Sequence, residues 1–455
     1  MKHSIDILLV NPWIHDFAAY DYWATPLGLL SIASLLKQWG LNVHFIDCLN
    51  SVHPDLAYEP HVTTPKRTVW GSGKYPKEEI EKPSVLLHVA RKYSRYGISP
   101  RIFEKELRAL PRPDTVFVTS MMTYWYPGVF ETIDHIRRVL PRVPIVLGGN
   151  YATLCYEHAK VHSGADIVFA GVAACRLPEL LFELLGQRFE NRGDREHPGP
   201  LPYPAYDLLP YREQVAIMTS QGCPFHCNYC ASSYLNPVFS VRDPVEVVDE
   251  IEYWHTQYGI RNFSFYDDAL LVNAKTRIMP MLEDILRRRL DCRFHCPNGL
   301  HIREITEELA HLMCLGGFKT VRFGFETSDR ERQIRSGGKI TNEETEKAIG
   351  HLKRAGYAAS DIGMYILCGL PGQEVCEVEE SIRFIQSCGV RPIIAEYSPI
   401  PHTELWGDAV ESSPYDIENE PLFHNNTLLP CGGKTMSYHE YQRLKNMARG
   451  PFPLD

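Results

Sequence analysis

Two runs of alternating strand and helix patterns dominate this 455-residue chain, and a segment rich in glycine and proline separates them. The length exceeds that of one ordinary core, so two to three domains are expected. Alternation of this kind predicts parallel sheets covered by helices. The separating segment, residues 186–210, contains three glycines and five prolines, a composition that predicts a linker.

The first run covers residues 1–185 and predicts a doubly wound, Rossmann-like α/β domain. A polar, charge-rich insertion over residues 51–110 interrupts it, with one or two helices expected. The expected strands are Ile5–Val10, Asn42–Ile46, Thr115–Thr119, Pro144–Leu147 and Ile167–Ala170. The expected helices are Pro26–Trp39, Gly128–Leu140 and Leu177–Leu185.

The second run covers residues 211–399 and contains six strand–helix units, fewer than the eight of a closed barrel. We therefore expect a partial (β/α)6 barrel. The expected strands are Val215–Thr219, Asn262–Tyr266, Arg293–Cys296, Thr320–Phe325, Ile362–Leu367 and Ile393–Tyr397. Asp243-Pro244 predicts the start of a helix that ends at Gly259. Residues 400–455 form an extension with one helix near Ser437–Met447.

Composition narrows the possible partners. The formal charge of −9 argues against a nucleic-acid surface as the main partner. The sequence contains no stretch of 18 apolar residues, so it predicts no transmembrane helix. The apolar run Ile5–Val10 is too short for a signal peptide. We expect a cytoplasmic protein that binds no membrane. We then expect its 13 cysteines to form no structural disulfides, and the scattered ones to be buried as small apolar residues.

Three cysteines stand apart because Cys223, Cys227 and Cys230 lie within eight residues of one another, directly after a predicted strand. Gly222 and Pro224 predict a loop, from which three thiolates can converge on one metal centre. Cysteine thiolates hold structural zinc and iron–sulfur clusters. A structural zinc site needs a fourth ligand, and His226, the one histidine within the loop, lies between two of the thiols and is expected to point away. Three ligands therefore favour a four-iron cluster with one open iron.

The spacing Cys223-x3-Cys227-x-Tyr229-Cys230 resembles the signature of the radical S-adenosylmethionine (SAM) superfamily. That resemblance implies a [4Fe–4S] cluster on the three cysteines, whose open iron chelates SAM and cleaves it reductively to a 5′-deoxyadenosyl radical. It also implies cofactor contacts at the ends of the later strands. The SAM-binding residues implied in this way are Tyr229, Asp267, Asp268, Gly324, Glu326, Ser328, Gly369 and Gly372. Helix capping by Asp267 and Asp268, and a plain turn at Gly372, are the structural alternatives.

An upstream α/β domain joined to such a barrel resembles the cobalamin-binding members of the superfamily. Ligands of doubly wound sheets bind beyond the carboxyl ends of the strands, and glycines there allow a nucleotide tail to approach the backbone. The residues implied for cobalamin are Pro26, Gly28, Thr119, Ser120, Gly148 and Gly149. The Asp-x-His-x-x-Gly motif that supplies an axial histidine is absent, since His15 has the wrong spacing. Tyr124-Trp125-Tyr126 is bulky where a corrin needs room.

Three functions compete. The first is a cobalamin-dependent radical SAM methyltransferase with a small-molecule substrate and an electron donor such as flavodoxin or ferredoxin. The second is a non-methylating radical rearrangement or cyclisation with a vestigial cobalamin domain, and the third is a non-catalytic metal-binding or regulatory protein. The Cys292/Cys296 pair is interpreted as coincidence. Pocket-lining candidates are His301, Arg303, Tyr365, Glu396, Tyr397 and His402. The sequence identifies no general acid or base.

Overall fold

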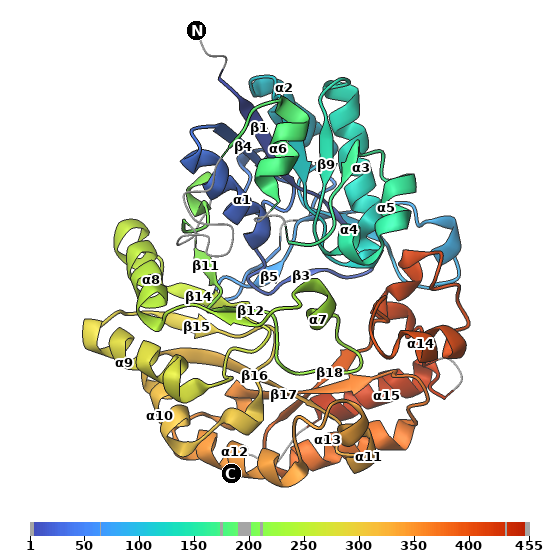
Figure 1. The fold of residues 1–455 in the computed structure, drawn as a ribbon. Coiled ribbons are helices and arrows are strands. Elements are labelled where there is room, and N and C mark those ends of the chain that lie inside the picture. Colours follow the sequence, from blue (N-terminus) through green and yellow to red (C-terminus); the bar gives the residue numbers. More distant parts are fainter. Residues whose placement is uncertain are drawn as a thin grey trace. The chain divides into compact units, whose positions relative to one another are not determined.

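The computed structural model describes residues 4–63, 65–172, 176–189, 202–209, 213–432 and 435–450. The chain divides into two compact units, Met1–Arg212 and Glu213–Asp455 (Figure 1). Cys175 and the greater part of the predicted linker lie outside the described residues. Within the part of the chain that is described, no helix is long and apolar enough to cross a bilayer.

The main sheet of the first unit has five parallel strands in the order β10-β9-β8-β1-β4. Their bounds are β1 Asp6–Asn11, β4 Asn42–Asp47, β8 Thr115–Val118, β9 Ile145–Leu147 and β10 Ile167–Val168. Strand order reverses between β1 and β8, so the loops after these two strands flank the point where such sheets bind ligands. The doubly wound arrangement predicted from the sequence is confirmed.

Alternate residues of β1 supply the two cores of this unit. Leu8 and Val10 pack in a cluster with residues of α2 (Pro100–Ala109) and α3 (Tyr126–Val139). Ile7 and Leu9 pack in another cluster with residues of α1 (Leu27–Gln38) and α6 (Leu177–Leu185). The strand is thus buried on both faces, as expected for a parallel sheet with helices on each side.

The predicted insertion contains short strands as well as the helix α2. Strands β2 (Ile14–Asp16), β7 (Ser94–Tyr96) and β6 (Lys77–Glu79) form an antiparallel sheet, and β3 (Tyr20–Asp21) pairs with β5 (Gly73–Lys74). Two short helices follow β9, namely α4 (Asn150–Leu154) and α5 (Tyr156–His162). At the end of the predicted linker, Ala205 and Tyr206 are buried within the first unit.

The main sheet of the second unit has six parallel strands in sequential order. They are β11 Gln214–Ile217, β14 Asn262–Phe265, β15 Arg293–His295, β16 Phe318–Glu326, β17 Ile362–Cys368 and β18 Arg391–Glu396. Figure 1 shows the intervening helices along the outside of this sheet. They are α8 Pro244–Tyr258, α9 Ile278–Arg288, α10 Glu307–Leu315, α12 Asn342–Arg354 and α13 Val375–Ser387. The parallel α/β order predicted for this region is confirmed.

Local sequence signals set the helix ends. Asp243 accepts a hydrogen bond from Val245 N at the start of α8, and Gly259 ends that helix with a φ of 70°. In the C-terminal extension, Ser437 and Glu440 form a capping box at the start of α15 (Tyr438–Arg449), which confirms the expected helix. The extension also contains α14 (Trp406–Ser412).

Candidate active site around the cysteine loop

The three clustered cysteines lie in an irregular loop between β12 (Ser220–Gln221) and α7 (Ser232–Leu235). Gly222, one residue before the first thiol, has a φ of 76°, and a Cβ there would lie 2.8 Å from Val238 O. Glycine is therefore required at the entrance of this loop. Cys223 and Cys227 are half-buried, whereas Cys230 is exposed, and all three are free thiols.

The three thiols lie close enough to influence one another. Burial raises the pKa of Cys223 to about 11, and the neighbouring thiols of Cys227 and Cys230 add to this shift. In the described part of the chain, no three His, Cys, Asp or Glu side chains are close enough to hold a single metal ion. Cysteine thiolates are the ligands of iron–sulfur clusters, so these three thiols are suitable donors for the expected cluster.

Glu326 and Lys339 form an ion pair next to the loop. Lys339 donates to Glu326 Oε1 at 2.7 Å and to the Tyr229 hydroxyl at 2.9 Å. Burial opposes the charge of Lys339, but the Glu326 carboxylate and the thiols of Cys227 and Cys230 outweigh it and raise its pKa. A Cβ at Gly324 would lie 2.6 Å from Glu326 Oε1, so the glycine makes room for this carboxylate.

Lys339 is a site residue that the sequence reasoning missed. It follows Gly337-Gly338 in the segment between α11 (Arg330–Arg335) and α12. A Cβ at Gly337 would lie 3.2 Å from His226 O, which brings this segment against the cysteine loop. The sequence did contain a signal for this residue. Lys339 follows two consecutive glycines, shortly after a strand that ends at Glu326 in the candidate site.

Three of the other residues expected to contact SAM occupy defined structural positions. Ser328 N donates to Ser381 Oγ of α13 at 2.9 Å, and the two hydroxyls lie 3.1 Å apart. Gly369 N donates to Gln373 Oε1 at 2.8 Å, which closes the turn after β17. Gly372 has a φ of 63°, and a Cβ there would meet no atom within 4 Å, so both the turn and an open approach are compatible with its place.

The two adjacent aspartates after β14 point to different ends of the cysteine loop. Asp267 accepts hydrogen bonds from Thr219 N, Thr219 Oγ1 and Ser220 Oγ, before the first thiol. Asp268 accepts a short hydrogen bond from Ser232 Oγ, after the last thiol. Burial raises the pKa of Asp267, against the effect of these hydrogen bonds.

The C-terminal extension contacts the middle of the same loop. Leu405 N donates to Asn228 O at 2.9 Å. The rings of Tyr234 and His402 stack with centroids 4.1 Å apart and an interplanar angle of 8°. The extension therefore contributes to the shape of the loop and of α7, the helix that follows it.

The pocket candidates fall into two groups. His301 stacks on Phe225 of the cysteine loop at 4.5 Å between centroids, and His402 stacks on Tyr234, so these two lie near the thiols. Tyr365 and Glu396 have partners elsewhere, namely Pro297 O and Lys445. Arg303 pairs with Glu344 and donates to Gly338 O next to Lys339, and Tyr397 lies in an apolar cluster against which Tyr229 of the cysteine loop packs.

In the first unit, two of the residues expected to bind cobalamin join neighbouring loops. Ser120 Oγ donates to Gly148 O at 2.7 Å, and a Cβ at Gly149 would lie 2.2 Å from Ser120 O. Gly149 therefore serves close packing of the loops after β8 and β9. Thr119 N donates to Val10 O at 3.2 Å, and Pro26 precedes α1.

Two other glycines of this set would accept a side chain without a clash. A Cβ at Gly28 would meet nothing within 4 Å, and one at Gly148 would make an ordinary contact with Phe169 O at 3.8 Å. Met121 and Met122, after β8, are exposed. Small and exposed apolar residues thus follow strands of this sheet on the side where doubly wound sheets bind ligands. Trp125 is held by a 2.8 Å hydrogen bond from its indole nitrogen to Asp16, and His15 is paired with Glu131.

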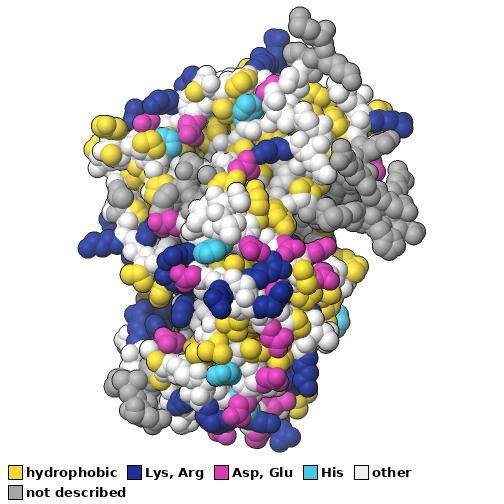
Figure 2. Space-filling view, turned by 90° about the vertical axis from the view of Figure 1, so that its left-hand side faces the viewer, with side chains coloured by type: hydrophobic (Ala, Val, Ile, Leu, Met, Phe, Trp, Pro, Cys, Tyr) yellow, Lys and Arg dark blue, Asp and Glu magenta, His cyan; other side chains and the backbone are white. Residues whose placement is uncertain are grey.

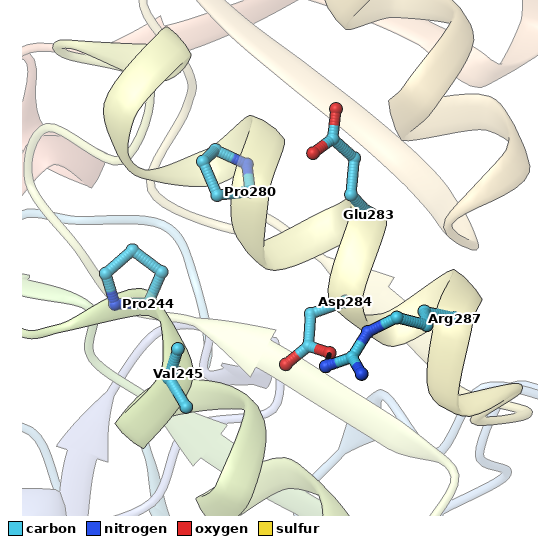
Figure 3. A pocket seen from close by; sticks show the side chains of 6 residues that line it. All are labelled: Pro244, Val245, Pro280, Glu283, Asp284 and Arg287. Carbon is cyan, nitrogen blue, oxygen red and sulfur yellow. Dashed lines mark hydrogen bonds and ion pairs between the residues drawn. The ribbon is translucent and has the colours of Figure 1, made fainter.

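A surface hollow of about 320 Å³ lies elsewhere in the second unit, between α8 and α9 (Figure 3). Its lining residues are Pro244, Val245, Pro280, Glu283, Asp284 and Arg287. None of the residues expected to bind a cofactor lines it.

On the face seen in Figure 2, basic and acidic side chains lie beside one another.

Comparison with known proteins identifies the region that contains this candidate site. Residues 217–385, which contain the cysteine loop and the Glu326–Lys339 pair, match the Radical SAM superfamily. This part of the chain is a radical SAM domain. The protein is thus a radical SAM enzyme, and the resemblance predicted from the cysteine spacing is confirmed.

Relatives extend the similarity beyond the radical SAM region. An uncharacterized methyltransferase of Pyrococcus horikoshii is 28% identical over 331 residues, which cover 66% of this chain and 70% of the relative. The cytidylyl-2-hydroxyethylphosphonate methyltransferase of Streptomyces wedmorensis is 23% identical over 90% of this chain and 83% of its own length. An anaerobic magnesium-protoporphyrin IX monomethyl ester cyclase of Rubrivivax gelatinosus is 26% identical over 68% of this chain and 61% of its own.

Solved structures share the fold of both units. The radical SAM methyltransferase TsrM of Kitasatospora setae, with tryptophan and a SAM analogue bound, superposes with a TM-score of 0.64 at 18% identity. The match covers 90% of this chain and 76% of TsrM. TsrM with cobalamin and a [4Fe–4S] cluster gives a TM-score of 0.62. The cobalamin-dependent radical SAM enzyme OxsB gives 0.58 at 14% identity, over 98% of this chain and 61% of OxsB.

Proposed function

We propose that this radical SAM enzyme is a cobalamin-dependent methyltransferase acting on a small molecule. The observation that carries the proposal is the extent of the similarity to the Streptomyces wedmorensis methyltransferase, which spans 90% of the chain and so includes both units. A likeness confined to the radical SAM region would support only SAM cleavage. The TsrM and OxsB folds, determined with cobalamin bound, support the same interpretation of the first unit.

The proposed domains follow from this function. Residues 1–185 form the cobalamin domain, with the insertion at 51–110 and the linker at 186–210. Residues 211–399 form the radical SAM partial barrel, and residues 400–455 form the C-terminal extension. When bound, the cluster supplies the electron that cleaves SAM, and cobalamin supplies the methyl-carrying centre. A flavodoxin or ferredoxin is the proposed electron donor, because each cleavage consumes one electron.

The residues of the second unit have distinct proposed roles. Cys223, Cys227 and Cys230 hold the cluster. Lys339 offers a buried ammonium next to the thiols, which suits the carboxylate of SAM, while Glu326 keeps that ammonium charged and in place. Gly324 leaves space for the carboxylate of Glu326.

The first unit has the proposed cobalamin site at the carboxyl edge of its sheet. Gly28 and Gly148 leave space for the tail, and Met121 and Met122 offer an apolar surface to the ring. His15 is engaged by Glu131 at 2.7 Å, so it is not proposed as an axial ligand.

A second function has support of its own, since a cyclase stands among the relatives. A non-methylating radical reaction would release 5′-deoxyadenosine without S-adenosylhomocysteine. The test incubates anaerobically reconstituted protein with hydroxocobalamin, dithionite, methyl-deuterated SAM and a small-molecule extract of cells. Release of both nucleoside products with a deuterated metabolite supports methyl transfer. 5′-Deoxyadenosine alone favours the cyclase-like reaction, and neither product would indicate a non-catalytic protein.

A further inference from the structure

We propose that Asp267 is a positioning residue that fixes the entrance of the cysteine loop through Thr219 and Ser220, while Asp268 fixes its exit through Ser232. The carboxylate of Asp267 then acts on the cofactor through the loop and does not contact it. This inference rests on the proposed role of the loop as a cluster site. It replaces the expectation that both aspartates contact SAM.

The hydrogen bonds of Asp267 are all directed at the segment before the first thiol. Its Oδ1 accepts from Thr219 N at 3.0 Å, from Thr219 Oγ1 at 2.7 Å and from Ser220 Oγ at 2.6 Å. Its Oδ2 accepts from Thr219 N at 3.1 Å. The residue is only 3% exposed, so these donors occupy a carboxylate that has little access to a ligand. Hydrogen bonds to a charged, buried acceptor are among the strong ones in proteins.

Arg277 completes the network from the segment that begins α9. Its Nη2 donates to Thr219 Oγ1 at 2.9 Å and lies 3.9 Å from Asp267 Oδ1. Its Nη1 donates to Val272 O at 2.9 Å. The Thr219 hydroxyl therefore donates a hydrogen bond to the carboxylate of Asp267 and accepts one from the guanidinium of Arg277. Arg277 also provides the positive charge that permits Asp267 to be ionised inside the protein.

Hydrogen bonds of the backbone hold the same two residues from a different direction. Arg242 N donates to Thr219 O at 2.8 Å, and Ser220 pairs with Val241 in the short antiparallel ladder of β12 and β13 (Ser240–Val241). Arg242 Nη1 also donates to Met218 O at 3.0 Å. Thr219 and Ser220 are thus fixed through both side chain and main chain. Since Cys223 follows within a few residues, its Cα has little freedom.

Asp268 holds the exit of the loop through a hydrogen bond from Ser232. Ser232 Oγ donates to its Oδ2, and Ser232 is the first residue of α7. Consecutive residues of one strand end thereby contact the chain just before Cys223 and just after Cys230. Because the two aspartates are consecutive residues just after β14, their hydrogen bonds connect both ends of the loop to the same short segment.

The test compares Asp267→Asn with Asp284→Asn in the full-length, anaerobically reconstituted protein. Asp284 is a matched control because it is also a largely buried carboxylate paired with arginine, in α9 and lining the hollow between α8 and α9. Asparagine keeps one acceptor oxygen and removes the charge. We expect the Asp267 variant to lose about tenfold in SAM affinity and to give a broadened, heterogeneous paramagnetic spectrum of the reduced cluster. The control should change SAM affinity less than about twofold.

A double-mutant cycle distinguishes positioning from direct contact. Thr219→Val removes the hydroxyl that links Asp267 to Arg277, and we expect its loss of SAM affinity and that of Asp267→Asn to be strongly non-additive. Additive losses would overturn the proposal, because they would show that Asp267 reaches SAM without the loop. An Asp267 variant with the SAM affinity and cluster spectrum of the control would overturn it as well.

Binding and methyl transfer are measured separately, which keeps this test distinct from that of the proposed function. Wild-type protein that binds iron and SAM but transfers no methyl group refutes the proposed function and leaves the cycle interpretable. Should Asp267→Asn fail to fold, Ser220→Ala removes a single hydrogen bond and is expected to weaken SAM affinity about threefold, with an unchanged value counting against the proposal.

Discussion

Lys339 Nζ lies 2.7 Å from Glu326 Oε1, and the side chains of both residues are nearly buried at 13% and 11% exposure. The ammonium also donates to the hydroxyl of Tyr229, the residue directly before Cys230. A buried ion pair is stable only while both partners remain, since the loss of one leaves an uncompensated charge. The pair thus joins the end of β16, the segment before α12 and the cysteine loop.

Lys339→Gln should weaken SAM binding by about tenfold or more, because it removes a charged donor and leaves the Glu326 carboxylate without its partner. Titration calorimetry with reconstituted protein measures the affinity, and the iron content should stay at the wild-type level. The exposed Lys347, in α12 of the same unit, gives the control variant Lys347→Gln. Equal SAM affinities in the two variants would show that Lys339 has no part in the site. Glu326→Ala is expected to resemble Lys339→Gln.

Replacing Cys223, Cys227 and Cys230 together with alanine should abolish iron and sulfide binding, whereas wild-type protein should hold about four irons. Iron and sulfide assays with the visible spectrum provide the measurement. The control also replaces three cysteines with alanine, at Cys314, Cys376 and Cys388, which lie in or beside helices of the same unit. Single changes at the buried Cys292 or Cys296 should also spare the cluster. Unchanged iron in the first triple variant would refute the assignment.

Gly28→Leu should prevent retention of hydroxocobalamin during gel filtration while leaving the fold intact. Gly28 is the second residue of α1, is exposed and has no atom within 4 Å of the position of an added Cβ. A leucine is compatible with the helix and extends into the proposed space for the cobalamin tail. Gly407→Leu is the control, since Gly407 is the second residue of α14 and is equally open. Retention by both variants would exclude this part of the site.

Asp47→Asn should stabilise the protein at pH 7.5 and have little effect at pH 4. Burial raises the pKa of Asp47 from 3.8 to about 6. A carboxyl group with a raised folded-state pKa stabilises the fold fully below its unfolded value, and that stability is lost as the pH rises through 6. The asparagine can retain the bonds from Asn11 and Leu49 and removes a penalty of about 1–3 kcal/mol.

The measurement for Asp47 is thermal unfolding as a function of pH between 4 and 7.5. Asp134→Asn on the exposed side of α3 is the control and should show no such pH-dependent gain. A variant whose unfolding temperature follows that of the wild type at every pH would show that Asp47 carries no such penalty.

Sequence patterns predicted the elements whose signal is local. The parallel strands were recognisable as apolar runs between helix periods, and Asp243 and Gly259 marked the ends of α8 because capping depends on adjacent residues. The short strands β2, β3, β5, β6 and β7 were not predicted. They contain two or three residues each. Two of them, β2 and β3, lie before the insertion and pair with β7 and β5 inside it, and no local hydrophobic pattern reveals such pairing.

In the candidate site, too, the sequence predicted only what neighbouring residues determine. The cysteine spacing was readable because all three thiols lie on one loop. Lys339 reaches Glu326 from a segment 13 residues further along the chain, so its role depends on how the loop before α12 folds back. Asp267 is recognisable in the sequence as a strand-end residue, but sequence alone gave no sign that Thr219, 48 residues earlier, would engage its carboxylate.

The hydrogen bond from Leu405 N to Asn228 O has a consequence for synthesis of the chain on the ribosome. Its two partners are 177 residues apart (405 − 228), so the three thiols emerge into solvent long before Leu405 is translated. Until then the centre of the cysteine loop lacks one of its anchors. A nascent or truncated chain that ends before Leu405 thus presents iron with a looser arrangement of thiols than the finished protein does. Delivery of iron to the loop in its final shape must therefore follow translation of the C-terminal extension.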